Sequence, residues 1–183
     1  MKNIFIPSSQ PGLNLAAFVH EPVEKPIGIA ILCPGYLDTK DYPDLIELAK
    51  DFTQEGYIVA SFDPLGTWSS DGSVDVYGLE QYQKDIISVQ NYMFTKYGEL
   101  AVVIGGKSMG GMISIVHAAK HPKLIKKVFG IVPPRGDKVH PQDQEWKEAG
   151  FRISKRDSPM IQIYIVLFRH RIRRSENSIH MIF

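Results

Sequence analysis

Apolar and polar residues alternate in blocks along the first 134 residues, and these blocks predict strands and helices in turn. Three runs are almost wholly apolar and end at or next to a proline, as expected of strands buried on both faces of a sheet. Three longer segments repeat apolar residues at spacings of three and four, which predicts amphipathic helices. The predicted strands are 3–6, 13–20, 28–33, 57–62, 101–104 and 128–132, and the predicted helices are 42–55, 79–93 and 109–119.

Strand and helix alternate from residue 28 to residue 132, and this order is typical of a parallel sheet. The first two strands are joined by the turn-rich segment 8–12, so we expect the sheet to begin with an antiparallel pair. The predicted fold class is therefore α/β. We expect a mostly parallel, twisted sheet of six or seven strands with helices on both faces.

Composition narrows the class of protein. The 183 residues carry a net charge of +1, with 44% apolar and 22% charged residues, which is ordinary for a globular domain. This balance predicts neither nucleic acid nor an acidic partner. Cys33 is the single cysteine, which excludes an internal disulfide and favours a reducing compartment, so we expect a cytoplasmic protein. No apolar run reaches the roughly 18 residues of a membrane span, and the N-terminus does not resemble a signal peptide.

The chemistry centres on one motif. The apolar strand that ends at Ile104 runs into the sequence Gly-Lys-Ser-Met-Gly at residues 106–110, and a helical pattern follows at once. This layout is typical of a nucleophile elbow, in which a serine occupies a cramped strand-to-helix turn. Glycine is favoured at Gly106 and Gly110 because a Cβ atom there would meet neighbouring backbone. The pattern predicts Ser108 at the carboxyl edge of the sheet, in front of a helix N-terminus.

Three further segments, 32–36, 62–72 and 121–128, flank the elbow at 106–110 in a characteristic order and spacing. Together with the elbow they resemble the α/β-hydrolase superfamily, and within it the branch of serine aminopeptidases and cinnamoyl (feruloyl) esterases. The sequence departs from the usual pattern at three places: Pro34 and Lys107 replace histidines, and Thr67–Trp68 replace His-Gly.

The resemblance implies a serine hydrolase mechanism. Ser108 would be the nucleophile, and the backbone amides of Tyr36 and Met109 would form the oxyanion hole. No cofactor and no metal are expected, because Asp63 and Asp71 have no His or Glu cluster at ligand spacing.

The acid and the histidine are harder to assign. In this fold they follow the serine in the order Asp or Glu, then His. Asp137 with His170 is one candidate pair, and Glu176 with His180 is a second whose members are very close in sequence. The third possibility is that the chain encodes neither partner.

The remaining histidines are expected to lie elsewhere. His20 precedes the serine and is predicted at the surface or at a strand edge. His117 should lie well below the site on the helix that follows Ser108, and His121 should end that helix. Tyr36, Trp68 and Tyr77 are candidates for an aromatic wall of an acyl pocket.

The character of the chain changes after residue 134. We expect a hydrolase core over 1–134, the start of a cap or lid over 135–159, and a strand-like segment with an irregular tail over 160–183. The strand-like segment is 160–168, and the tail is rich in isoleucine and arginine without a period. This pattern predicts a truncated or frame-shifted end, so that the last strands of the sheet are missing and an edge is exposed.

Two functions follow. The first is hydrolysis of a small-molecule carboxylic ester or, as second choice, an amide. The alternative is a truncated or inactive hydrolase homologue that only binds, or has no function. Neither nucleic acid nor membrane is expected as a partner, and the sequence predicts no oligomeric state.

Overall fold

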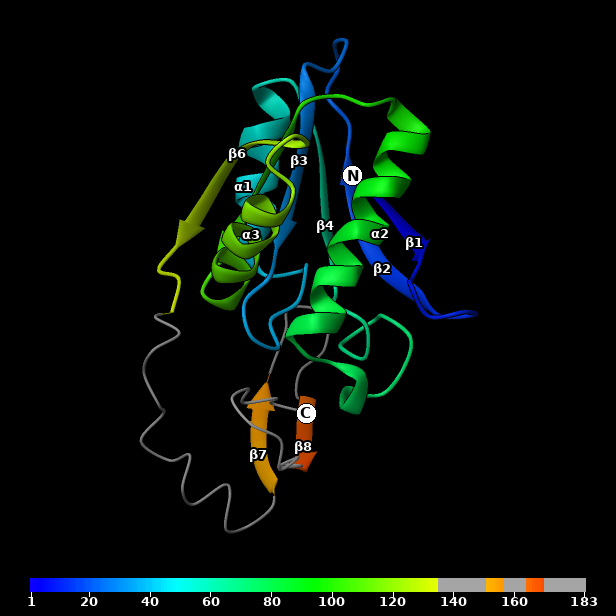
Figure 1. Cartoon of the computed structure of the whole chain (residues 1–183), viewed down its shortest axis with the longest axis vertical. Helices are drawn as coiled ribbons and strands as arrows, with labels where there is room; N and C mark the ends of the chain where they lie inside the picture. The colour runs from blue at the N-terminus through cyan, green and yellow to red at the C-terminus, as the bar shows by residue number, and fades with distance from the viewer. Residues whose placement is uncertain (135–150, 157–163, 170–183) are drawn as a thin grey trace.

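The computed structural model describes residues 1–134, 151–156 and 164–169. Its main body is a six-stranded sheet with the strand order β1-β2-β4-β3-β5-β6 (Figure 1). The strands β1 and β2 run antiparallel to each other, β2 is antiparallel to β4, and the pairs β4–β3, β3–β5 and β5–β6 are parallel. The predicted fold class and the antiparallel start are therefore confirmed. The strands are β1 (Lys2–Pro7), β2 (Asn14–His20), β3 (Gly28–Cys33), β4 (Tyr57–Phe62), β5 (Val102–Lys107) and β6 (Ile125–Ile131).

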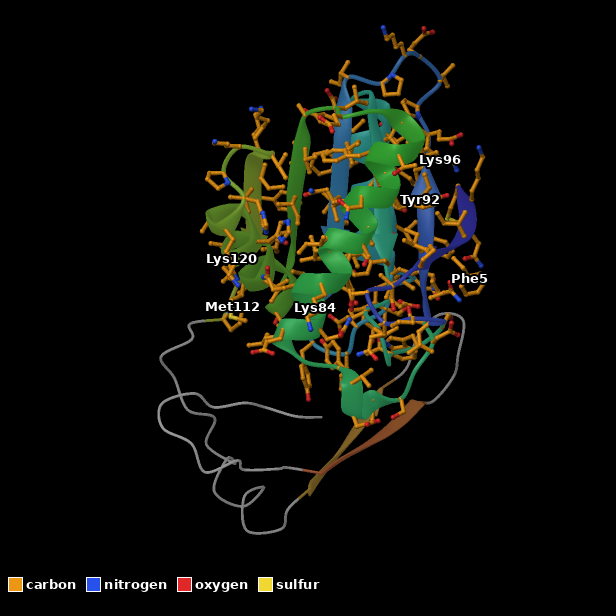
Figure 2. The ribbon with its side chains drawn as sticks, turned by 45° about the vertical axis from the view of Figure 1, so that its right-hand side comes forward. Phe5, Lys84, Tyr92, Lys96, Met112 and Lys120 are labelled. Carbon is orange, nitrogen blue, oxygen red and sulfur yellow. The ribbon has the colours of Figure 1, made fainter. Side chains whose placement is uncertain are left out.

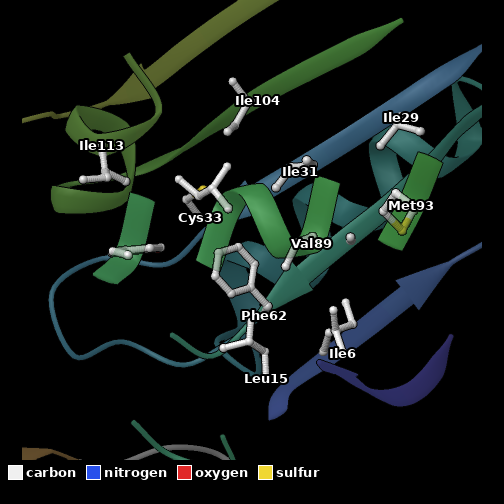
Figure 3. Packing of buried hydrophobic residues seen from close by; sticks show 14 of the residues in the cluster. Ile6, Leu15, Ile29, Ile31, Cys33, Phe62, Val89, Met93, Ile104 and Ile113 are labelled. Atoms are coloured by element: carbon white, nitrogen blue, oxygen red, sulfur yellow. The ribbon is translucent and has the colours of Figure 1, made fainter. Parts of the chain in front are cut away.

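Three helices cover the two faces of this sheet (Figure 1). Helix α1 (Pro43–Gln54) packs on one face, and α2 (Leu79–Tyr97) and α3 (Met109–Lys120) pack on the other. Alternate residues of the central strand β3 separate the two layers, because successive side chains of a strand point to opposite faces. Ile31 and Cys33 join Val89 of α2 and Ile113 of α3 in the larger core (Figure 3), whereas Leu32 belongs to the α1 side.

The carboxyl ends of the parallel strands meet at one edge of the sheet, and the loops that follow them gather there. Helices α2 and α3 both begin at this edge, and Figure 2 shows Lys84 of α2 and Met112 of α3 near it. A short 3₁₀ helix, η1 (Val74–Val76), lies in the loop before α2. In an open parallel sheet this edge is where ligands bind.

The edge strand β6 corrects one expectation. The segment 128–132 was predicted to be buried on both faces because it is apolar. The strand is Ile125–Ile131, and it forms the end of the sheet, with Val128 41% and Ile131 45% exposed. An apolar run does not distinguish a central strand from an edge strand, because the arrangement of the whole sheet decides whether a strand has one or two neighbouring strands.

A second, two-stranded sheet lies apart from the first. Its antiparallel strands are β7 (Phe151–Arg156) and β8 (Tyr164–Arg169). The sequence predicted a strand over 160–168, which β8 overlaps, but it did not predict β7. Strand β8 contacts η1, so this small sheet stands below the carboxyl edge of the main sheet (Figure 1).

His20 is a second correction. It was predicted at the surface or a strand edge, but β2 lies between β1 and β4 and the side chain is buried. Its Nε2 atom has no hydrogen-bond partner. Burial lowers the pKa of His20, so the ring is neutral at physiological pH.

Candidate active site

Ser108 occupies the turn between β5 and α3. Its backbone has φ 51° and ψ −122°, a positive-φ conformation that is uncommon for residues other than glycine. The turn is fixed on both sides: the Ser108 N–H donates to the carbonyl of Ile131 in β6 at 2.8 Å, and the Ser108 carbonyl accepts from the N–H of Met112 at 3.1 Å. The side chain is half-buried. Strained backbone of this kind costs about 1–3 kcal/mol and concentrates at functional sites.

The glycines on either side of Ser108 are required by contact with β3. A Cβ atom on Gly106 or on Gly110 would collide with the carbonyl oxygen of Cys33, and at Gly110 also with that of Pro34. Cys33 is the last residue of the central strand β3 and Pro34 follows it directly, so these backbone atoms cannot move aside. The end of β3 therefore lies against both flanks of the serine turn.

The two predicted oxyanion-hole residues lie on neighbouring segments. Met109 is the first residue of α3, and the first N–H groups of a helix have no acceptor within the helix. Tyr36 follows Gly35 in the loop after β3, and a Cβ on Gly35 would stand 3.4 Å from the carbonyl oxygen of Lys107. The loop that carries the Tyr36 amide thus runs beside the turn that carries Ser108.

The three aromatic residues proposed for a pocket wall behave differently from one another. Tyr77 is only 1% exposed, so it belongs to the core rather than to an open wall. The rings of Tyr36 and Tyr77 are 6.2 Å apart and tilted by 44°. The Trp68 indole Nε1–H donates to the carbonyl of Leu37 at 2.9 Å, so this ring is bound to the loop after β3.

A buried ion pair supports this region, and sequence reasoning missed it. Lys40 Nζ lies 2.8 Å from Asp63 Oδ2, with side chains 2% and 0% exposed. Asp63 also accepts hydrogen bonds from the Thr39 hydroxyl and from the N–H groups of Lys40 and Ser69. Burial raises the pKa of the Asp63 carboxyl, and the Lys40 ammonium opposes that effect. The pair joins the loop after β3 to the loop after β4.

Lys107, directly before Ser108, makes a different ion pair. Its Nζ lies 2.8 Å from Asp44 Oδ2 at the start of α1, and both side chains are about half exposed. The hydrogen bond to Asp44 raises the pKa of Lys107. An exposed pair of this kind contributes about 0–1 kcal/mol to stability.

Two described histidines lie in or directly after the helix that follows Ser108, and neither is close to Ser108 along that helix. His117 is nine residues further along α3, about 13 Å along the helix axis. It is buried between Gln83 and Gln90 of α2, with ring nitrogens 3.4 and 3.5 Å from their Oε1 atoms. His121 follows the last turn of α3, as predicted. The predicted pair Asp137 and His170, and the alternative pair Glu176 and His180, lie outside the described residues.

His117 should make the fold sensitive to acid. Burial, with smaller contributions from His121 and Lys120, lowers its pKa to about 4. Because its folded pKa lies below its unfolded value of about 6.5, the stability from neutral His117 is present above pH 6.5 and is lost as the pH falls toward 4. At pH 5 the loss relative to pH 7.5 is about 2 kcal/mol.

The measurement is urea unfolding of wild type and His117→Gln at both pH values. Asp85 is also buried and burial raises its pKa to about 6, so it titrates in the opposite sense in both proteins. The comparison therefore uses the difference between wild type and variant. We expect His117→Gln to lose about 2 kcal/mol less than wild type on acidification. Equal losses would show that His117 is not held neutral in the fold.

The described part of the chain contains neither a metal-binding cluster nor a membrane-spanning helix. No three His, Cys, Asp or Glu side chains within residues 1–134 form a group that would hold a metal ion. Likewise, no helix in the described part of the chain has the length and apolar character of a membrane span.

The order of strands, the two helical layers and the serine turn at the carboxyl edge define an α/β-hydrolase fold. Solved structures agree on the fold. They include Est1E from Butyrivibrio proteoclasticus with ferulic acid bound (20% identity, TM-score 0.62, covering 67% of this chain and 49% of that one). A thermostable carboxyl esterase from Bacillus coagulans matches with 20% identity and a TM-score of 0.61, covering 81% and 48% of the two chains.

The model of the serine aminopeptidase S33 family matches residues 24–178, so the chain belongs to that family. Mouse alpha/beta hydrolase domain-containing protein 10 is another similar structure, with 21% identity and a TM-score of 0.66, covering 83% of this chain and 60% of its own. This chain thus spans about half of the two esterases and somewhat more of the mouse protein. Comparison with curated proteins gave no match.

Proposed function

We propose that the protein is a serine hydrolase that cleaves a small-molecule carboxylic ester, or as second choice an amide. The observation that carries the proposal is the conformation of Ser108: a positive-φ serine on a strand-to-helix turn, with both flanking glycines pressed against the end of β3. A turn of this shape exposes the hydroxyl of a serine at the edge of the sheet. The esterases among the similar structures support the ester as the first choice.

In the proposed mechanism, Ser108 Oγ attacks the ester carbonyl carbon while a histidine takes its proton. The carbonyl oxygen becomes an oxyanion, which the N–H groups of Tyr36 and Met109 stabilise. The tetrahedral intermediate then expels the alcohol, which receives the proton from the histidine, and water releases the acid by the same route. We assign the base to His170 and its orienting acid to Asp137.

We also propose that the chain is divided into three segments. Residues 1–134 would be the hydrolase core, 135–159 the start of a cap or lid, and 160–183 a strand-containing segment that follows it. The two-stranded sheet of β7 and β8 supports the boundary at residue 134, because it is separate from the main sheet and β8 contacts η1 near the carboxyl edge. This sheet pairs a strand of the second segment with a strand of the third. The single, buried Cys33 agrees with a cytoplasmic location.

The test is covalent labelling of the folded chain with a fluorophosphonate, which reacts with activated serines. We expect one adduct per chain by intact mass, located by peptide mapping on Ser108. Prior denaturation should abolish the reaction, because activation depends on the folded site. A folded chain that is not labelled, or is labelled elsewhere, would refute the assignment of Ser108.

A panel of substrates then separates the two choices. Aryl and alkyl carboxylic esters, including a ferulate ester, are compared with aminoacyl anilides at equal concentration. Faster turnover of esters supports an esterase, and faster turnover of anilides supports a peptidase.

A further inference from the structure

The loop after β3 contains a strained turn next to the proposed oxyanion hole. The N–H of Asp38 donates to the carbonyl of Gly35 at 3.2 Å, which closes a turn over Gly35, Tyr36, Leu37 and Asp38. Leu37 has φ 53° and its side chain is only 2% exposed. A left-handed conformation costs a non-glycine residue about 1–2 kcal/mol, so other contacts must hold it.

Three aromatic side chains supply those contacts, each on a different peptide group of the turn. The Tyr82 hydroxyl donates to the carbonyl of Pro34 at 2.8 Å. The Leu37 N–H donates to the Tyr77 hydroxyl at 3.4 Å, and the Trp68 indole Nε1–H donates to the Leu37 carbonyl at 2.9 Å. The peptide group that carries the Tyr36 N–H lies between the peptide groups that these three side chains hold.

The three aromatic residues are themselves rigidly placed. The Tyr77 and Tyr82 rings are 6.2 Å apart in the core, and Tyr82 packs edge-on against Phe62 at 5.8 Å. Trp68 has φ 46° and precedes Ser69, whose N–H donates to the buried Asp63 carboxylate. Residues of β4, of the loop after β4 and of α2 therefore fix the position of the turn after β3.

We propose that Trp68, Tyr77 and Tyr82 are positioning residues for the oxyanion hole. They hold the Pro34–Leu37 backbone so that the Tyr36 N–H is directed at the carbonyl oxygen of the substrate bound at Ser108. None of the three touches the reacting atoms in this arrangement; each acts through the backbone of Pro34 or Leu37. This inference rests on the proposed function and adds to it the residues that orient one of its two donors.

The sharpest test is Trp68→Phe, which removes the indole donor and keeps an aromatic ring. We expect kcat for a p-nitrophenyl ester to fall about tenfold with KM within twofold of wild type, because the hole acts on the transition state. Complete removal of an oxyanion donor costs about 10² to 10³ in rate, and displacement of the donor should cost less. The rate of fluorophosphonate labelling should fall by the same factor.

Tyr82→Phe is the second variant, since it removes the donor to Pro34 without changing the ring. Tyr97→Phe is the matched control: it deletes a hydroxyl that donates to Glu21 at 2.6 Å, far from the loop after β3, and should keep wild-type kcat. Melting temperatures of all variants show that each is folded at the assay temperature.

The outcomes separate the two proposals. A wild-type chain without labelling refutes the proposed function itself. A labelled wild type with Trp68→Phe and Tyr82→Phe both within twofold of its kcat overturns the positioning role alone. A rise in KM with unchanged kcat also overturns it, because such a change would mean loss of substrate binding rather than of transition-state stabilisation.

Discussion

Replacing Ser108 with alanine should reduce kcat for ester hydrolysis by roughly 10⁶ and abolish fluorophosphonate labelling. The expected loss is large because the hydroxyl is the atom that bonds to the substrate, and the oxyanion donors alone recover only about 10³ to 10⁴ over the rate in water. The fold should persist. Alanine and serine pay the same cost for φ 51°, and the hydrogen bonds of this turn that join it to Ile131 and Met112 use the backbone of residue 108.

The measurements are steady-state kinetics with a p-nitrophenyl ester, labelling, and thermal unfolding. Ser88→Ala is the control: it removes a half-buried serine hydroxyl from α2, away from the turn, and should keep wild-type kcat. If Ser108→Ala keeps more than a tenth of the wild-type kcat, the nucleophile is another residue. If the melting temperature of Ser108→Ala is close to that of wild type, the loss of kcat is due to the missing hydroxyl and not to unfolding.

Asp63→Asn should lower the free energy of unfolding by about 3 kcal/mol. The substitution keeps the shape of the side chain but removes the charge that faces Lys40 Nζ at 2.8 Å, and the Lys40 side chain that loses this partner is only 2% exposed. Asp41 Oδ1, at 3.5 Å, remains as a weaker partner, which places the loss at the lower end of the range for broken buried pairs. Urea unfolding at pH 7 measures the change.

The structure offers a matched control with the same geometry and the opposite exposure. Lys107 and Asp44 also lie 2.8 Å apart, but both side chains are about half exposed. Asp44→Asn should therefore cost less than about 1 kcal/mol. Similar losses from the two substitutions would mean that burial does not determine the contribution of the Asp63 pair. Asp63→Asn should also slow hydrolysis, since Asp63 holds the loop that carries Trp68.

Strands were predicted well where local pattern alone decides them. Segments 28–33 and 57–62 coincide with β3 and β4, because apolar, β-branched runs that end beside proline favour buried strands. Strand β7 was missed, since Phe151 and Ile153 alternate with charged and polar residues over only six positions. His20 was misjudged because it is buried at the end of an interior strand, where it pairs with Val59 of β4, and no local pattern reports that neighbour.

The location of the serine turn could be predicted from local sequence. A serine with a glycine two residues before it and another two residues after it, placed between a strand and a helix, is a local signal. The sequence also predicted that a Cβ at these glycines would meet backbone, but not which backbone: it is the carbonyl of Cys33, more than 70 residues earlier in the chain. The buried pair Lys40–Asp63 and the bond from Trp68 to Leu37 likewise join residues 23 and 31 positions apart. These contacts form because β3 and β4 are neighbours in the sheet, which brings the loops that follow them together.

By itself the sequence determined the α/β class, the order of strands and helices over residues 1–134, and the serine at the carboxyl end of β5, because each depends on side-chain periodicity and backbone freedom within a few residues. Only the tertiary structure decided which strands form the edge, which charges are buried together and which side chains hold the loop beside the serine. These features depend on distances between segments that are remote in the chain, and packing into a common core sets those distances.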